Sequence, residues 1–405
     1  MKSSTTTAAP ETARGPASTL IHSGAVLSGM LTTLLGPLLP VLSARWSLDD
    51  AQAGYFFTAQ FAGSMTGAAI SGLLLPRRGF RFALVLGFAL VAAGAVALGS
   101  GGWATGLLSV FVYGAGLGFT IACTNLWVSE SNPEKRAQAL NILNFAWGAG
   151  CVASPFLFAE LLRRGHDGAL LIALGVAFAI VAVALARIPF AEPKPVEEES
   201  DFAAARPGFW SFRFGPTLGA MFFLYVGAEI AVGGWVASHA QRVSVGTGTL
   251  WALAPAFFWG ALVAGRALAP AALRHVSEAR IVLGGLVLAS LGVGGMLGAA
   301  SLAKVLGAAC LAGFGFSAIF PTLAAWIAPA FGASSARFGG RMFALGAMGG
   351  ATVPSLVGFF STHFGGLRAG LLAPLACNAI MLVLLLLTPP PAAKSPKISV
   401  PLEPF

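Results

Sequence analysis

Two short stretches, "GLLLPRRGFR" (Gly72 to Arg81) and "GRALAPAALR" (Gly265 to Arg274), occupy matching places in the two halves of the chain. Each follows a long apolar run, carries basic residues, and starts 193 residues from the other. Two further pairs have nearly this spacing: "GLGFTIACTNL" from Gly116 pairs with "GFGFSAIFPTL" from Gly313, and Gly150 and Pro155 pair with Gly349 and Pro354. A repeated spacing of this kind indicates internal duplication. The chain is therefore predicted to consist of two similar halves.

The composition around these stretches is that of a membrane protein. Of 405 residues, 57% are hydrophobic and 10% charged, whereas soluble domains carry about 25% charged residues. A spanning helix needs roughly 20 mostly apolar residues, because no backbone group exposed to lipid can stay unpaired. We predict an all-α membrane protein with twelve transmembrane helices, at 19–43, 50–75, 81–100, 103–130, 137–162, 168–188, 214–240, 247–270, 279–299, 301–328, 337–361 and 367–388.

These spans divide into two six-helix bundles joined by a polar segment. The predicted parts are a tail (1–18), a first bundle (19–188), a linker rich in proline and acid (189–213), a second bundle (214–388) and a tail (389–405). With the amino terminus cytoplasmic, cytoplasmic segments hold 18 of the 24 Lys and Arg residues, Arg266 among them. Since basic residues favour that side of a membrane, we expect a multi-pass protein of the plasma (inner) membrane with both termini cytoplasmic. The net charge of +9 is then explained by topology, and no nucleic-acid partner is expected.

Twelve helices as six plus six, basic loops after the second and eighth helices, and a central linker resemble the major facilitator superfamily. The loop signature of that family is Gly-x-x-x-Asp-Arg-x-Gly-x-Arg. The matching loop carries Gly72, Arg77, Arg78, Gly79 and Arg81. The resemblance implies that these residues form a gating loop. Pro76 stands where the family has Asp, so the gate departs from the family pattern here.

Three stretches are similar to the fucose permease group and the related sodium-dependent glucose transporter branch. They are "RAQALNILNFAWGAGCVASP" from Arg136, "YVGAEIAVGGW" from Tyr225 and "GFGFSAIFPT" from Gly313. The resemblance implies a secondary active transporter that moves a small neutral solute, such as a monosaccharide, by alternating access and ion-coupled symport. The proton-coupling acids that fucose permeases carry in helices one and four are missing, and Ile121 stands at the second position.

Two other functions stay open from the sequence. The aromatic segment "GTLWALAPAFFWG" suits an exporter of drugs, lipids or other amphipathic compounds, and an uncoupled uniporter needs no coupling residue. An enzyme is not expected, because no nucleophile–base pair, metal-ligand spacing or phosphate loop is present. We expect no cofactor and a monomer whose partners are the lipid bilayer and a small-molecule substrate, a sugar.

Glu229 is the only one of fifteen acidic residues near the middle of a predicted span. A charge there costs about 2.5–3.5 kcal/mol on insertion scales, so such residues usually face the protein interior and have a function. We predict that Glu229 couples transport to an ion. It would either bind sodium, for which a carboxylate oxygen is a suitable hard ligand, or accept a proton. The alternative is a structural Glu229, held by hydroxyls or by a basic residue on a neighbouring helix.

The remaining candidates for substrate binding are neutral. Amides and hydroxyls can pair with the hydroxyls of a sugar, and aromatic rings can cover its apolar face. With Glu229, the predicted set is Gln60, Asn125, Asn141, Asn144, Trp147, Tyr225, Trp235 and Trp259. The alternative for the amides is that they only join helices to one another.

Overall fold

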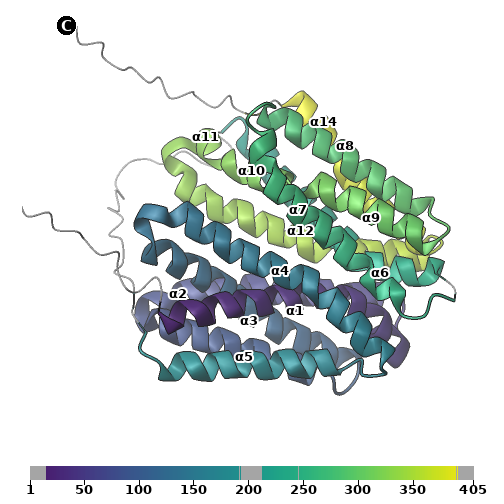
Figure 1. The fold of residues 1–405 in the computed structure, drawn as a ribbon. Coiled ribbons are helices and arrows are strands. Elements are labelled where there is room, and N and C mark those ends of the chain that lie inside the picture. The colour runs from purple at the N-terminus through teal and green to yellow at the C-terminus, as the bar shows by residue number, and fades with distance from the viewer. Residues whose placement is uncertain (1–14, 191, 193–211, 245, 389, 391–405) are drawn as a thin grey trace, which may run out of the picture.

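The computed structural model describes residues 15–190, 192, 212–244, 246–388 and 390. The predicted tails and linker lie almost entirely outside these residues. The described part of the chain is helical, with turns between helices (Figure 1). Eleven helical segments of this part are long and apolar enough to cross a membrane, which confirms the multi-pass membrane protein.

The first half consists of α1 (Pro16–Trp46), α2 (Asp50–Ala97), α3 (Trp103–Ser131), the 3₁₀ turn η2 (Pro133–Lys135), α4 (Arg136–Arg163) and α5 (Ala169–Arg187). Helix α2 has 48 residues and includes one non-helical position, Gly79, with φ 77° and ψ 171°. It therefore contains two predicted spans, 50–75 and 81–100. Counting them separately turns the eleven segments into the predicted twelve.

The second half begins with α6 (Gly215–Val243), η4 (Leu250–Leu253), α7 (Ala254–Ala272) and α8 (Glu278–Leu297). The predicted span 301–328 is broken into α9 (Leu302–Phe316), α10 (Ile319–Ala325) and α11 (Ile327–Phe331). It is followed by η5 (Gly332–Ser334), α12 (Ser335–His363), α13 (Leu367–Gly370) and α14 (Leu372–Leu387).

The two halves lie side by side as two bundles, with the purple-to-teal helices below the green-to-yellow ones in Figure 1. Across the boundary, α2 packs on α12, α1 on α6, and α4 on α7. Glycines allow this close approach, as is common between membrane helices. A Cβ atom on Gly36 of α1 would lie 3.0 Å from the carbonyl oxygen of Gly234 in α6, and one on Gly358 of α12 would lie 2.2 Å from that of Asp50 in α2. The ranges 19–188 and 214–388 remain our division of the chain.

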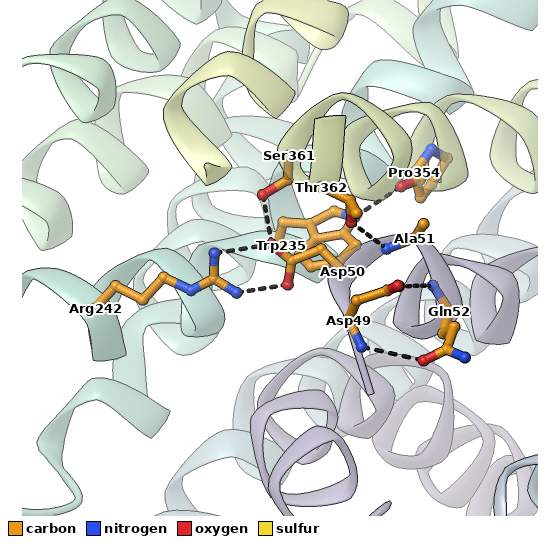
Figure 2. A network of polar contacts seen from close by, with 9 residues as sticks. All are labelled: Asp49, Asp50, Ala51, Gln52, Trp235, Arg242, Pro354, Ser361 and Thr362. Carbon is orange, nitrogen blue, oxygen red and sulfur yellow. Dashed lines mark hydrogen bonds and ion pairs between the residues drawn. The ribbon is translucent and has the colours of Figure 1, made fainter. Parts of the chain in front are cut away.

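The start of α2 is fixed by a capping box. Asp49 Oδ1 accepts a hydrogen bond from the Gln52 amide at 2.7 Å, and Gln52 Oε1 accepts one from the Asp49 amide at 3.2 Å (Figure 2). This pairing satisfies two amides that a helix start leaves free. It also places Asp50 at the first position of the helix, at the boundary between the halves.

Candidate functional site

A cavity of about 310 Å³ lies between the two halves. Its size is at the lower end of small-molecule sites. The polar side chains in its wall are Ser28 of α1, Thr124 and Asn125 of α3, Asn144 of α4, Glu229 of α6 and Arg266 of α7. The apolar part of the wall is Ala25, Ile121, Leu143, Trp147, Val226 and Phe320. Both halves therefore contribute to one site.

Glu229 is buried in the wall of this cavity and is held by two groups of the second half. Its Oε1 accepts a hydrogen bond from the Tyr225 hydroxyl at 2.9 Å and one from Arg266 Nη2 at 3.1 Å. Helical spacing predicts the first contact, since residues four apart share a face. The Tyr225 hydroxyl also lies 3.0 Å from the carbonyl oxygen of Phe316. The charge in the cavity is thus an ion pair and not a lone carboxylate.

Arg266 is a cavity-wall residue that the sequence prediction missed, because it was counted with the cytoplasmic segments. It lies in the cavity wall, and its side chain is 31% exposed against 8% for Glu229. Its Nε is buried without a hydrogen-bond partner among the described residues. The signal was present, because position 266 falls inside the predicted span 247–270. A search for bases inside spans, matching the search for acids, would have found it.

Four of the predicted substrate residues line the cavity: Asn125, Asn144, Trp147 and Glu229. Ser28 and Phe320 line it without having been predicted. Ile121 of α3 lies in the wall as well, so the position at which the resemblance to fucose permeases implies an acid is apolar here. Asn144 has no hydrogen-bond partner within the described ranges, whereas Asn125 Nδ2 donates to the Ile121 carbonyl at 2.8 Å.

The other predicted substrate residues lie outside the cavity wall. Tyr225 is buried behind Glu229, and Trp259 packs edge-on against Trp147 with ring centroids 6.4 Å apart. Gln60 is buried and accepts a hydrogen bond from the Tyr113 hydroxyl at 2.9 Å. Trp235 Nε1 donates to the Pro354 carbonyl at 2.8 Å, and Asn141 is exposed in the second turn of α4.

The predicted gating loop forms a turn that is held by an acid from the linker. Both carboxylate oxygens of Glu192 accept backbone hydrogen bonds, from Phe80 at 2.8 Å and Arg81 at 3.0 Å. Arg81 Nε donates to the Leu185 carbonyl at 3.2 Å, and its Nη2 donates to the next carbonyl, that of Ala186. The loop thus has a carboxylate although position 76 is proline. The sequence prediction did not include Glu192, which is far from the loop in the chain.

Two arginines of the loop interact with nearby groups, and its other glycine has open space where a Cβ atom would stand. Arg77 Nη1 donates to the Leu73 carbonyl at 2.8 Å, and the Arg78 guanidinium lies 5.6 Å from the Phe82 ring centroid. A Cβ atom on Gly72 would meet nothing within 4 Å.

At the opposite end of the helices, polar contacts join the two halves (Figure 2). Both oxygens of Asp50 in α2 accept hydrogen bonds from Arg242 in α6, at 2.5 and 2.8 Å, and Ser361 of α12 also donates to Asp50. The Ala51 amide donates to Thr362 Oγ1 at 2.9 Å. These contacts close the boundary at the end where α2 starts. The cavity-lining positions lie nearer to the other end, where the Gly79 turn is found.

Known proteins with similar sequences and folds were compared with this chain. The sequence model described as "Major Facilitator Superfamily" matches residues 21–328. A glucose/galactose transporter of Brucella abortus is 25% identical over 376 residues, which cover 87% of this chain and 89% of the relative. Sodium-dependent glucose transporter 1 of Danio rerio is 25% identical over 401 residues, covering 83% and 62%.

Among solved structures, that of the E. coli fucose:proton symporter is similar in fold. It has a TM-score of 0.60 and 18% identity, over 91% of this chain and 97% of that one. The matched family and these relatives are transporters, which confirms the expectation that the chain is not an enzyme.

Proposed function

The chain belongs to the major facilitator superfamily, and from this premise we propose that it transports a monosaccharide by alternating access. The observation that carries the proposal is the mixed wall of the cavity between the halves. Each half contributes polar groups and one aromatic ring, Trp147 from the first and Phe320 from the second. A site built from both halves is what alternating access around a central solute requires.

The free polar groups of the cavity suit hydroxyls. The Asn144 amide is unpartnered among described residues and offers both a donor and an acceptor. Asn125 uses its Nδ2 on the Ile121 carbonyl, which leaves its carbonyl oxygen to accept from a sugar hydroxyl. The rings of Trp147 and Phe320 supply flat apolar surface for the C–H face of the sugar.

Glu229 is the proposed coupling residue. It is the one carboxylate in the cavity wall, and the coupling ion would be sodium or a proton. The names of the relatives support both ions, since one is a sodium-dependent glucose transporter and one structure is a fucose:proton symporter. No cofactor is needed for this activity.

The proposed location is the plasma (inner) membrane, where the protein acts as a monomer with both termini and the linker cytoplasmic. The asymmetry of Lys and Arg supports this orientation. With this orientation, the closed end at Asp50 is external, and the cavity lies nearer to the cytoplasm. The structure then corresponds to an inward-facing state.

The test is uptake into liposomes that contain the purified full-length protein. Labelled D-glucose and D-galactose would be offered under an imposed sodium gradient, a proton gradient or none. The wild type is expected to accumulate at least one hexose under one gradient, and Glu229→Gln is expected to exchange that hexose without accumulating it. Glu160→Gln is the matched control, because Glu160 is exposed at the end of α4 and pairs with Arg163. Absence of both uptake and exchange in the wild type would rule out these sugars.

An exporter of amphipathic compounds is the second candidate. Half of the residues in the cavity wall are apolar, and such a surface also accommodates a hydrophobic solute. Extrusion of a lipophilic cationic dye from the same liposomes, competing with no hexose, would support this candidate and contradict sugar transport.

A further inference from the structure

A second cavity, of about 730 Å³, lies at the ends of three helices of the first half. Its wall is formed by the start of α1, the end of α3 and the start of α4, and we call it the lateral cavity. These helix ends are opposite to the end at which α1 finishes near Asp50. The residues that form this wall all differ from those that line the central cavity. The lateral cavity is therefore a separate site.

The wall of the lateral cavity changes from polar to apolar along the helices. Every polar side chain in it lies close to a helix end: Ser18, Thr19, His22 and Ser23 in the first two turns of α1, and Asn132 directly after α3. Deeper along α1 and α4 the wall is apolar, with Val26, Ile142, Phe145 and Ala146. At 1.5 Å per residue, the wall extends roughly 12 Å along α1. A ligand that fills this cavity needs a polar head and an apolar remainder.

The apolar part of the lateral cavity opens away from the central cavity. Ile142 and Phe145 of α4 are 54% and 68% exposed. With 3.6 residues per turn, they lie on a different face of α4 from Leu143 and Trp147, which line the central cavity. Large apolar side chains exposed together mark a surface that contacts a membrane or another protein. On a membrane-spanning helix, this face meets the acyl chains of lipids.

The polar part of the lateral cavity offers two donors and two acceptors. The hydroxyls of Thr19 and Ser23 form no hydrogen bond with any residue that the structure describes. His22 Nδ1 lies 2.8 Å from the Ser18 carbonyl oxygen; because that oxygen can only accept, Nδ1 carries the hydrogen and Nε2 of the neutral ring is an acceptor. Asn132 Nδ2 donates to the Val128 carbonyl at 2.9 Å, so its own side-chain oxygen is free to accept. The two hydroxyls suit a phosphate, and the two acceptors suit an ammonium group.

The charges beside the polar part are balanced. Between residues 128 and 138 the chain carries two acids, Glu130 and Glu134, and two bases, Lys135 and Arg136. Glu130 is close enough to Arg136 for their charges to interact. Residues 15–28, at the start of α1, include no Asp, Glu, Lys or Arg. There is thus no excess of positive charge to attract an anionic headgroup, and a headgroup with one charge of each sign fits better.

The related place in the second half has a cavity without this polar wall. Gly340 and Phe343 line it, 198 residues after Ile142 and Phe145. Among its lining residues, only Ser335 has a hydroxyl group, and none has an amide or imidazole side chain. The repeat therefore accounts for a hollow at this place, but the hydroxyl, imidazole and amide groups are particular to the first half.

We propose that the lateral cavity binds one phospholipid whose headgroup carries a phosphate and a primary ammonium group, as in phosphatidylethanolamine. The phosphate accepts hydrogen bonds from Thr19 and Ser23, and the ammonium group donates to His22 Nε2 and Asn132 Oδ1. An acyl chain lies along the apolar face at Phe145. The lipid comes from the leaflet at the Gly79 end of the helices. This inference does not depend on which solute the protein transports.

Native mass spectrometry of the full-length protein, titrated with lipid in detergent, tests the inference. The wild type is expected to hold phosphatidylethanolamine at least roughly tenfold more tightly than phosphatidylcholine, which has no N–H donor, or phosphatidylglycerol, which has no ammonium group. Thr19→Val/Ser23→Ala should weaken binding by roughly tenfold, since two hydrogen bonds to a charged phosphate are lost. Its melting without lipid should not change, because these hydroxyls have no partner among the described residues. Ser335→Ala is the matched control and should bind like the wild type.

Three results of the titration would overturn the inference. Full affinity in Thr19→Val/Ser23→Ala, or an equal loss in Ser335→Ala, would show that the lateral cavity does not hold the lipid. Equal or tighter binding of phosphatidylcholine or phosphatidylglycerol would exclude the proposed headgroup contacts. Competition by glycerophosphoethanolamine, which has the headgroup without acyl chains, at the same concentration as the lipid would show that the ligand is a soluble phosphate ester.

Photolabelling of the wild type gives a result that needs no variant. Phosphatidylethanolamine with a diazirine on one acyl chain should label peptides that contain residues 18–26 and 139–146. The peptide that contains residues 324–343, at the related cavity of the second half, should be labelled less. Equal labelling of the two regions would mean that lipid covers the surface without selecting the lateral cavity, and the inference would be wrong.

Discussion

At the scale of single residues, Glu229 and Arg266 compensate each other for the cost of burial. Removing one member of a buried ion pair leaves an unpaired charge and usually costs about 3–5 kcal/mol. Here the Arg266 side chain is 31% exposed, so water reduces the penalty. We predict that Arg266→Gln lowers the free energy of unfolding by roughly 2 kcal/mol, and that the double variant with Glu229→Gln recovers most of it. Thermal melting of detergent-purified protein, followed by intrinsic tryptophan fluorescence, measures the loss in Arg266→Gln and the recovery in the double variant. A loss in the double variant equal to the sum of the losses in the two single variants would show that the two side chains act independently.

Gln60 and Asn144 were both predicted to bind substrate, and the structure gives them different surroundings. Gln60 is buried and bonded to Tyr113, whereas Asn144 lies in the cavity wall without such a partner among described residues. We predict that Gln60→Ala costs about 1 kcal/mol of stability through the lost hydrogen bond and leaves solute affinity unchanged. Asn144→Ala should weaken solute binding by roughly tenfold, the value of one hydrogen bond of about 1.4 kcal/mol, with unchanged melting. Equilibrium binding of the transported hexose and thermal melting, measured on both variants, distinguish a binding residue from a structural one. Weaker hexose binding in Gln60→Ala with normal binding in Asn144→Ala would place Gln60 in the site.

At the scale of elements, the turn within α2 depends on Gly79 and not on Gly72. Gly79 has a positive φ of 77°, and a Cβ atom there would lie 2.8 Å from Glu192 Oε1. Gly72→Ala is a matched control in the same loop, because its Cβ would meet nothing within 4 Å. Residues other than glycine in such a conformation cost about 1–3 kcal/mol. Gly79→Ala should therefore melt at a lower temperature and transport more slowly, while Gly72→Ala should match or exceed wild-type stability. A lower melting temperature in Gly72→Ala, with none in Gly79→Ala, would show that the loop has another conformation.

The contact of α2 with α6 and α12 is the second feature at this scale. The Asp50–Arg242 pair joins the halves with two hydrogen bonds (Figure 2), and its loss should favour opening at this end. We predict that Arg242→Gln shifts the ratio of open to closed forms by about fivefold, for a partly exposed pair worth about 1 kcal/mol. Thr32 of α1 lines a small gap between the halves together with Gly36 and Gly234. Labelling of a cysteine introduced there by an impermeant thiol reagent, with the four native cysteines replaced, reports the opening.

The Arg45–Asp167 pair is the control for this prediction. It is a single ion pair of 2.6 Å within the first half, at the same end of the molecule. Arg45→Gln should leave labelling at Thr32 unchanged. If both variants raise labelling alike, the effect comes from surface charge and not from the link between the halves.

The elements and the site differ in how much of them the sequence could predict. Spans follow from local apolar composition, so the helices fall near their predicted bounds, and the break of α2 at Gly79 falls between two predicted helices. Glu229 was predicted because a buried carboxylate is conspicuous within one helix. Its partner Arg266 is 37 residues away on α7, and Glu192 lies more than 100 residues from the amides that it caps. Such pairings depend on how helices pack, which local composition does not determine.

At the scale of the whole molecule, the two halves meet closely at one end and enclose a cavity nearer to the other. The close end is made by backbone contact, with Gly36 against Gly234 and Gly358 against Asp50, and by the polar contacts around Asp50. A carrier that rocks two bundles about a central site has to separate these surfaces to open on this side. The glycines allow the backbones to come close, but they add no bond or charge that holds the halves together. The polar contacts add specificity for the closed arrangement.

A bulky residue at Gly358 should therefore hold the carrier in the opposite state. In the closed arrangement its Cβ would lie 2.2 Å from the Asp50 carbonyl oxygen, a backbone atom that moves only with its helix. We predict that Gly358→Leu separates α2 from α12 at this end, keeps solute binding, and lowers net transport at least roughly tenfold, because alternation needs both states. Distances between spin labels placed across each end should increase at the Asp50 end and decrease at the Gly79 end. Gly284→Leu on α8 is the matched control, since its Cβ meets nothing within 4 Å, and it should transport normally. Normal transport by Gly358→Leu would mean that these surfaces do not come together during the cycle.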